Sequence, residues 1–190
     1  GEEVFFQNAQ EIFGRFPEVD FGIYECPMPW KRLVSLDFLR KVAPEGRMVF
    51  LKDTCCDYEL IRERLKAVEG TPLKIFNANA QSWYDSYCHG SAGYNGVMAN
   101  FHPDLYKWAY DHKDSDPEKA QLVAHFLTTA AMIEMRAYPV SAKYHQNLVD
   151  VPMSLVTRSA DAAKLDKNAR GEVESLIAME NYVRKQLGIL

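Results

Sequence analysis

MVFLKDTCCDYELIRERLKAVEG, residues 48 to 70, contains the unit on which the fold is built. The stretch from 47 to 54 has the continuous apolar character of a buried strand, and it ends in polar residues. Asp57 then begins an amphipathic helix as its cap, and Gly70 ends that helix. The apolar residues of the helix recur at steps of three, four and three residues: Tyr58, Ile61, Leu65 and Val68. A buried strand followed by such a helix is one βα unit.

Three more units of this kind are visible. Strands are predicted at 21 to 26, 73 to 79 and 93 to 100. Helices are predicted at 4 to 14, 35 to 43, 80 to 90, 102 to 112, 116 to 136 and in the last eleven residues. Ser35 is expected to cap the second of these helices, and Asp116 the fifth. Alternation of apolar strands and helices indicates a parallel sheet covered by helices. Four units can form a small open sheet, or half of a (β/α)8 barrel, whose full form takes about 250 residues.

The composition is that of a folded protein: 190 residues, 47% hydrophobic, 25% charged and net charge −4. No apolar run approaches the roughly 18 residues of a membrane span, and the first ten residues lack a secretory signal pattern. These features predict a cytoplasmic protein without a membrane partner. The mildly acidic balance, without Lys/Arg clusters, argues against a nucleic-acid partner.

A metal site is not expected. The four cysteines, at 26, 55, 56 and 88, lack a C-x-x-C pair, and the five histidines lack an H-x-x-x-H arrangement. Adjacent cysteines rarely bridge or chelate together, so reduced thiols are predicted.

Lys52 is the first candidate for chemistry, because it stands at the carboxyl end of a predicted parallel strand, where active sites gather in barrels and open sheets. A free lysine is charged at neutral pH, so a nucleophilic lysine needs desolvation or a cationic neighbour. The apolar strand supplies such desolvation. The plainer alternative is a lysine that reaches solvent or pairs with Asp53.

Tyr24 ends the preceding strand in the same way. Adjacent parallel strands put their ends side by side, so the phenol and the amine are expected to face one pocket. A tyrosine there can transfer protons to a carbinolamine or imine. The alternative is a half-buried aromatic residue with a solvated hydroxyl group.

GSAGYNGVMAN, residues 90 to 100, is rich in glycine but leads into a strand, whereas phosphate-binding glycines follow a strand and open a helix. The segment is interpreted as a tight turn that lets the backbone of Tyr94 to Val97 approach a ligand.

These stretches together resemble the dihydrodipicolinate synthase and N-acetylneuraminate lyase family of class I aldolases. IYECP (23 to 27) is similar to the family's Y-N-x-P, and FLKDTCCD (50 to 57) to its I-K-D-S-x-G-D. GSAGYNGVMAN-x-x-P is similar to its G-A-x-G-x-I-S-x-x-A-N-x-x-P, and YPVSAKYHQNL (138 to 148) to its Y-P-x-x-x-K. Lys52 lies 28 positions after Tyr24, and this separation matches the family's spacing.

The resemblance implies a (β/α)8 barrel of which this chain contains about the last four βα units, at 1 to 136, and a C-terminal helical extension, at 137 to 190. It implies that Lys52 forms an imine with pyruvate or a related 2-oxo acid, without metal or other cofactor, and that Tyr24 relays protons. The second substrate is then expected to be an aldehyde. The implied substrate-binding residues are Asn79, Tyr94, Asn95 and Gly96.

Several positions depart from the family pattern. Pro29 replaces the arginine of dihydrodipicolinate synthases, so that particular activity is not expected. The family's Gly-Asp-Asp appears as Asn77, Ala78 and Asn79, and a glycine after the lysine strand appears as Cys56. The chain resembles the C-terminal half of the barrel, which predicts exposed strand edges and association, either as a homo-oligomer or with an N-terminal half. Two alternatives are a non-catalytic relative used for ligand binding or assembly, and an unrelated open-sheet protein.

Overall fold

The computed structural model describes residues 1–189. The chain divides into two compact units, Gly1–Gly96 and Val97–Leu190. The predicted boundary at residue 136, between a half-barrel and a C-terminal helical extension, is a different division and stays a prediction.

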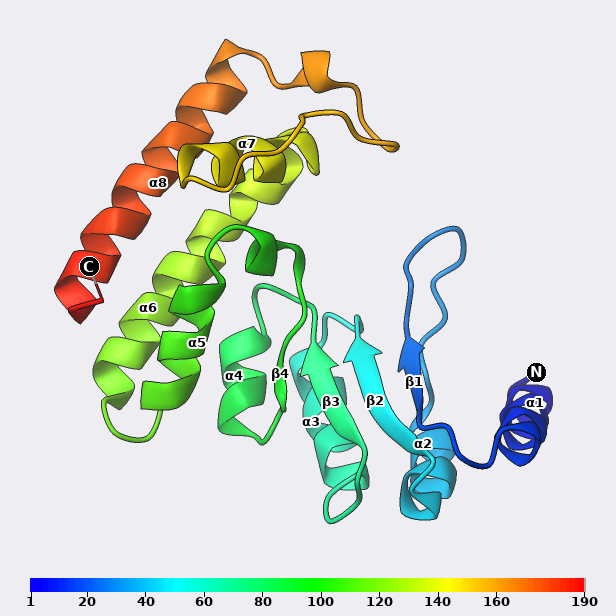
Figure 1. The fold of residues 1–190 in the computed structure, drawn as a ribbon. Helices are drawn as coiled ribbons and strands as arrows, with labels where there is room; N and C mark the ends of the chain where they lie inside the picture. Colours follow the sequence, from blue (N-terminus) through cyan, green and yellow to red (C-terminus); the bar gives the residue numbers. More distant parts are fainter. Residues whose placement is uncertain (190) are drawn as a thin grey trace. The chain divides into compact units, whose positions relative to one another are not determined.

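The first unit is built on a four-stranded parallel sheet (Figure 1). Its strands are β1 (Phe21–Tyr24), β2 (Met48–Asp53), β3 (Lys74–Asn77) and β4 (Gly93–Tyr94). Their spatial order, β1-β2-β3-β4, is the order along the chain. A doubly wound open sheet reverses its strand order at a switch point, whereas a barrel does not. The sheet is therefore of the barrel type, as expected, and the alternative of an unrelated open sheet is not supported.

The helices of this unit overlap the predicted segments, with starts that differ by up to three residues. They are α1 (Glu2–Arg15), α2 (Leu36–Val42), the 3₁₀ helix η1 (Ala43–Glu45), α3 (Tyr58–Ala67) and α4 (Trp83–Cys88). Ser35 caps α2 by accepting from the Phe38 N–H at 3.0 Å, and Asp57 caps α3 by accepting from the Leu60 N–H at 2.8 Å. Gly46, at φ +74°, ends η1.

The two faces of the sheet differ. Leu51 and Ile75 point to the helices and join a buried core with residues of α2 and α3 such as Phe38 and Ile61. Because side chains alternate along a strand, the residues next to Leu51 on β2 and next to Ile75 on β3 point to the opposite face. Phe50 and Phe76 lie on that second face, with ring centroids 5.1 Å apart, and they are only partly buried.

The predicted strand at 93 to 100 is wrong beyond Tyr94. Strand β4 contains only Gly93 and Tyr94, and the 3₁₀ helix η2 (Val97–Asn100) follows. Gly96 explains the early end, since a Cβ atom there would lie 2.1 Å from the Tyr94 hydroxyl oxygen. The chain turns back closely over the tyrosine ring, and an extended strand cannot do this.

The second unit is helical. It contains α5 (Pro103–His112), α6 (Pro117–Ala130), η3 (Ala131–Met135), α7 (Val140–Leu148), η4 (Ala162–Lys164) and α8 (Lys167–Leu187). Asp116 caps α6 as predicted, accepting from the Lys119 N–H at 3.3 Å. Among the described residues, no helix is long and apolar enough to cross a membrane.

Candidate active site

The ends of β1 and β2 bring Tyr24 and Lys52 together. The two residues are partners in the parallel register, so their side chains leave the same face of the sheet. The Lys52 Nζ atom lies 4.2 Å from the centroid of the Tyr24 ring. Lys52 is partly buried, and Tyr24 is 49% exposed. The juxtaposition that the sequence predicts is therefore present, while the catalytic roles of the two residues stay predictions.

The surroundings of Lys52 are largely aromatic. Its register partner on β3 is Phe76, and Phe50 precedes it by two residues on the same face. A cationic amine over an aromatic ring is attracted by the negative face of that ring.

Asp53 does not pair with Lys52. Strand alternation sends its side chain to the helix-covered face, where it is fully buried with Glu25, the residue that follows Tyr24. The guanidinium group of Arg64 on α3 pairs with both carboxylates: Nη1 contacts Asp53 Oδ2, and Nη2 lies 2.8 Å from Glu25 Oε1. This buried ion triad, Glu25, Asp53 and Arg64, is a feature that the sequence prediction missed.

The two carboxylates of the triad keep Arg64 protonated. Burial alone lowers the pKa of a guanidinium group, but the carboxylates of Asp53 and Glu25 raise the pKa of Arg64 above its ordinary value. Arg64 is thus a permanent cation on the helix-covered face of the sheet, next to the ends of β1 and β2.

Asn79 lies in the loop after β3, and its side chain is engaged within that loop. Its Oδ1 atom accepts from the Ser82 N–H and hydroxyl, both at 2.9 Å, and its Nδ2 donates to Gln81 Oε1 at 2.8 Å. The buried Asn77 side chain in turn donates to Ser82 and Ser86 of the α4 region. The Nδ2 group has two N–H donors and makes one of these bonds, so the predicted contact of Asn79 with substrate stays a prediction.

The three other predicted binding residues lie at the end of β4. Tyr94 is the register partner of Asn77, and its ring lies 6.0 Å from that of Trp83 on α4. Tyr94 therefore lies on the face opposite to Lys52. The Asn95 N–H continues the sheet by donating to the Asn77 carbonyl at 2.8 Å. The backbone of Tyr94 to Val97 remains the part expected to approach a ligand.

The Cys55 thiol, near the site, is a poor nucleophile because of its environment. Burial, followed by the negative charge of Asp53, raises the pKa of Cys55 to about 12. Within residues 1–189, no group of three or more His, Cys, Asp or Glu side chains is arranged to hold a metal ion.

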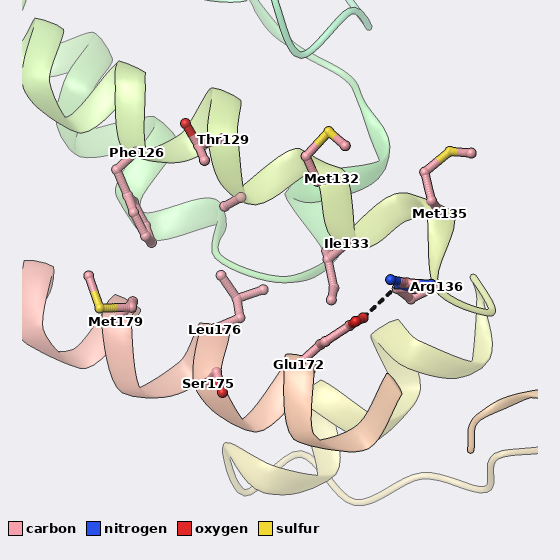
Figure 2. A pocket seen from close by; sticks show the side chains of 11 residues that line it. Phe126, Thr129, Met132, Ile133, Met135, Arg136, Glu172, Ser175, Leu176 and Met179 are labelled. Carbon is pink, nitrogen blue, oxygen red and sulfur yellow. Dashed lines mark ion pairs between the residues drawn. The ribbon is translucent and has the colours of Figure 1, made fainter. Parts of the chain in front are cut away.

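The second unit contains a separate cavity of about 660 Å³, which Figure 2 shows. It lies between α6, η3 and α8 and is mostly apolar, with Phe126, Met132 and Met179 in its wall. Arg136 and Glu172 form an ion pair of 2.7 Å there. None of the predicted site residues lines it, and no lysine does.

Sequence comparison gives no relatives: no protein-family model and no curated protein matches this chain. Structure comparison gives many. The chain superposes on a monomeric dihydrodipicolinate synthase variant with a TM-score of 0.78 and 17% identity, over 100% of this chain and 62% of that one.

Two further structures show the same likeness. For the dihydrodipicolinate synthase of Thermotoga maritima the TM-score is 0.75 at 18% identity, over 100% of this chain and 63% of that one. For the sialic acid aldolase of Ruminococcus gnavus the TM-score is 0.81 at 16% identity, over 98% of this chain and 62% of that one. The chain thus spans about three fifths of the length of these proteins. It has the fold of part of the barrel of dihydrodipicolinate synthases and sialic acid aldolases, the family that its motifs resemble.

Proposed function

We propose that this chain carries the imine-forming half of a class I lyase or aldolase that acts on pyruvate or a related 2-oxo acid. The observation that carries the proposal is the Lys52 amine, 4.2 Å from the Tyr24 ring centroid at the carboxyl ends of adjacent parallel strands. Lys52 is the nucleophile, and Tyr24 relays protons.

The reaction follows from these two groups. The neutral amine of Lys52 attacks the keto carbon of the 2-oxo acid, and the resulting carbinolamine loses its hydroxyl group as water to leave an imine. Tyr24 donates the proton that this leaving group needs and receives one back. The protonated imine draws electrons from the adjacent carbon, which can then lose a proton and attack an aldehyde, or release one in the reverse direction.

Two of the similar structures support this chemistry. One is a dihydrodipicolinate synthase from Acinetobacter baumannii in complex with pyruvate, and another is a catalytic-lysine mutant of the Ruminococcus gnavus sialic acid aldolase. Both are 16% identical to this chain, and the chain covers 62% of each. In this sequence, Lys52 stands at the position of the lysine in the family motif.

The second substrate is an aldehyde, but not necessarily that of dihydrodipicolinate synthase. The loop after β1 has Pro29 where those enzymes have an arginine. The same loop exposes Trp30, at 86%. Because the arginine of the family pattern is missing at position 29, we do not expect the aldehyde of dihydrodipicolinate synthases to be the substrate.

The test is reductive trapping. The chain is incubated with pyruvate and borohydride and then mapped by peptide mass spectrometry. We expect a reduced pyruvyl adduct on Lys52 that is lost in Lys52→Ala and kept in Lys66→Ala, a change at an exposed lysine of α3. An unmodified Lys52 would refute the proposal. Saturable pyruvate binding that persists in Lys52→Ala, without turnover of any aldehyde, would favour a ligand-binding relative instead.

A further inference from the structure

The buried ion triad lies directly behind the proposed catalytic pair. Glu25 follows Tyr24, and Asp53 follows Lys52, so each proposed catalytic residue is one peptide bond from a triad member. Alternation puts the catalytic side chains on one face and the carboxylates on the other. The Glu25 N–H donates to the Lys52 carbonyl at 3.3 Å, which extends the pairing with β2 past the end of β1.

The triad also binds the loops that leave these strands. The Glu25 carboxylate accepts from the Val34 N–H at 2.7 Å and from the Thr54 N–H at 2.8 Å. Arg64 donates to the Val34 carbonyl at 2.5 Å. Val34 ends the loop that contains Trp30, so one guanidinium group fixes both strand ends and the return of this loop.

Stability alone does not explain a buried ion triad. All three charged side chains are completely buried, and ion pairs of this kind often stabilise less than apolar residues of equal volume. The Arg64 Nε–H is also buried without a hydrogen-bond partner among the described residues. Apolar side chains would pack α3 on the sheet equally well. What they would not provide is a fixed set of directed bonds between the two strand ends.

We propose that Arg64 is a positioning residue for the Tyr24–Lys52 pair: by holding Glu25 and Asp53 it fixes the phenol and the amine relative to each other. The effect on imine chemistry rests on the function proposed above, whereas the effect on the geometry of the pair does not. Reacting groups held by their neighbours in this way lose rate steeply when they are displaced by about 1 Å.

The test compares Arg64→Lys with Arg62→Lys in the full chain. Lysine keeps the charge but has a single ammonium group, which cannot bridge two carboxylates and a carbonyl as the planar guanidinium does. Arg62 is a matched control: it lies on the same helix and binds Asp85 at 3.0 Å, away from the strand ends. Glu25→Gln is the second variant, since it removes the charge pairing and keeps an acceptor for the backbone.

Two measurements separate the geometry from the chemistry. The first is the NMR shift of the Lys52 ε-methylene group, which the Tyr24 ring moves upfield because the amine lies over it. We expect this shift to collapse in Arg64→Lys and Glu25→Gln and to persist in Arg62→Lys. The second is the rate of borohydride trapping at saturating pyruvate. We expect it to fall about 100-fold in the first two variants, with less change in the pyruvate concentration at half-saturation.

The outcomes are distinct. If the ring shift is lost in Arg64→Lys but no protein forms an adduct, the proposed function fails and the positioning role stands. A folded Arg64→Lys protein with the original ring shift and trapping rate would overturn the inference about Arg64. Loss of cooperative unfolding in both Arg64→Lys and Glu25→Gln would also overturn it, because Arg64 would then act on the whole fold.

Discussion

At the scale of single residues, Cys56 shows what a departure from a family motif costs. The family has a glycine at this place, and Cys56 adopts a positive φ of 57°. A side chain in this left-handed region costs about 1–2 kcal/mol, which glycine avoids. The sequence shows the replacement, but only the backbone angle shows why glycine is favoured.

We therefore expect Cys56→Gly to raise the free energy of unfolding by about 1 kcal/mol, less than the full strain because glycine also loosens the unfolded chain. Urea denaturation measures the change. Cys56→Ala is the control: it removes the thiol and its 3.4 Å contact with the Thr54 carbonyl but keeps the Cβ atom, so it should bring no gain. An equal gain in both variants would assign the effect to the thiol.

Tyr24 gives a second prediction at this scale. Tyr24→Phe keeps the ring under the Lys52 amine and removes only the hydroxyl group. Under the proposed function we expect pyruvate still to form the Lys52 adduct, while imine formation slows about 10²–10⁴-fold, the usual contribution of a positioned acid or base. Tyr182→Phe, at a tyrosine that is 59% exposed, is the control. Unchanged kinetics in Tyr24→Phe would remove Tyr24 from the mechanism.

The sequence predicted the caps and missed the triad for physical reasons. Ser35, Asp57 and Asp116 act through local hydrogen bonds, which follow from the neighbouring residues alone. Arg64 depends on partners on two different strands. A signal was nevertheless present: Arg64 lies three residues after Ile61 and four before Val68, within the apolar face of its helix. A charged residue at such a position needs a buried partner.

At the scale of elements, the last strand and the last helix were the least predictable. The apolar residues at 97 to 99 are typical of a strand, but the strand ends earlier because the backbone at Gly96 approaches the Tyr94 side chain closely. Helix α8 begins at Lys167, well before the segment predicted to be helical. Its docking depends on the buried Glu180, which pairs with residues far away in the sequence.

Glu180 makes the second unit sensitive to acid. Its Oε1 lies 2.6 Å from His102 Nδ1, and its Oε2 lies 3.0 Å from His145 Nε2 on α7 and 3.2 Å from Arg184 Nη1. Burial opposes the ionised carboxyl group, but hydrogen bonds from the two histidines outweigh it and lower its pKa from 4.5 to about 2.

A lowered pKa in the folded state means that the carboxylate stabilises the protein above pH 4.5 and that this contribution is lost as the pH falls towards 2. Glu180→Gln should cost about 3 kcal/mol at pH 7, and the difference from the original protein should shrink on acidification. Urea denaturation from pH 7 to 3 measures it. Glu174→Gln, an exposed change on the same helix, should show no such trend. A difference that is constant with pH would mean that the carboxylate charge is not responsible.

At the scale of the whole molecule, motif order and spacing were sufficient to predict the barrel-type sheet. The four strands follow each other in sequence order, and the chain superposes on about three fifths of each barrel protein. Assembly is different, because it depends on surfaces rather than on motifs. One of the similar structures is described as a monomeric variant, so this fold alone does not fix an oligomeric state.

The exposed parts of the sheet nevertheless predict association. Strand β1 has a neighbour on one side only within the described sheet, and unpaired strand edges bind other chains. Phe50 and Phe76 add a partly exposed apolar surface beside it. We expect sedimentation of this 21.7 kDa chain to show dimers or larger species whose share grows with protein concentration.

Phe50→Ser should weaken this association, provided that thermal unfolding shows the variant to be folded. Met135→Lys is the control, because Met135 is 81% exposed in the other unit, on the wall of the cavity in Figure 2. Equal weakening by both changes would mean that association is not specific to the sheet. A single species of monomer mass at every concentration would show that the strand edge is protected by the chain itself.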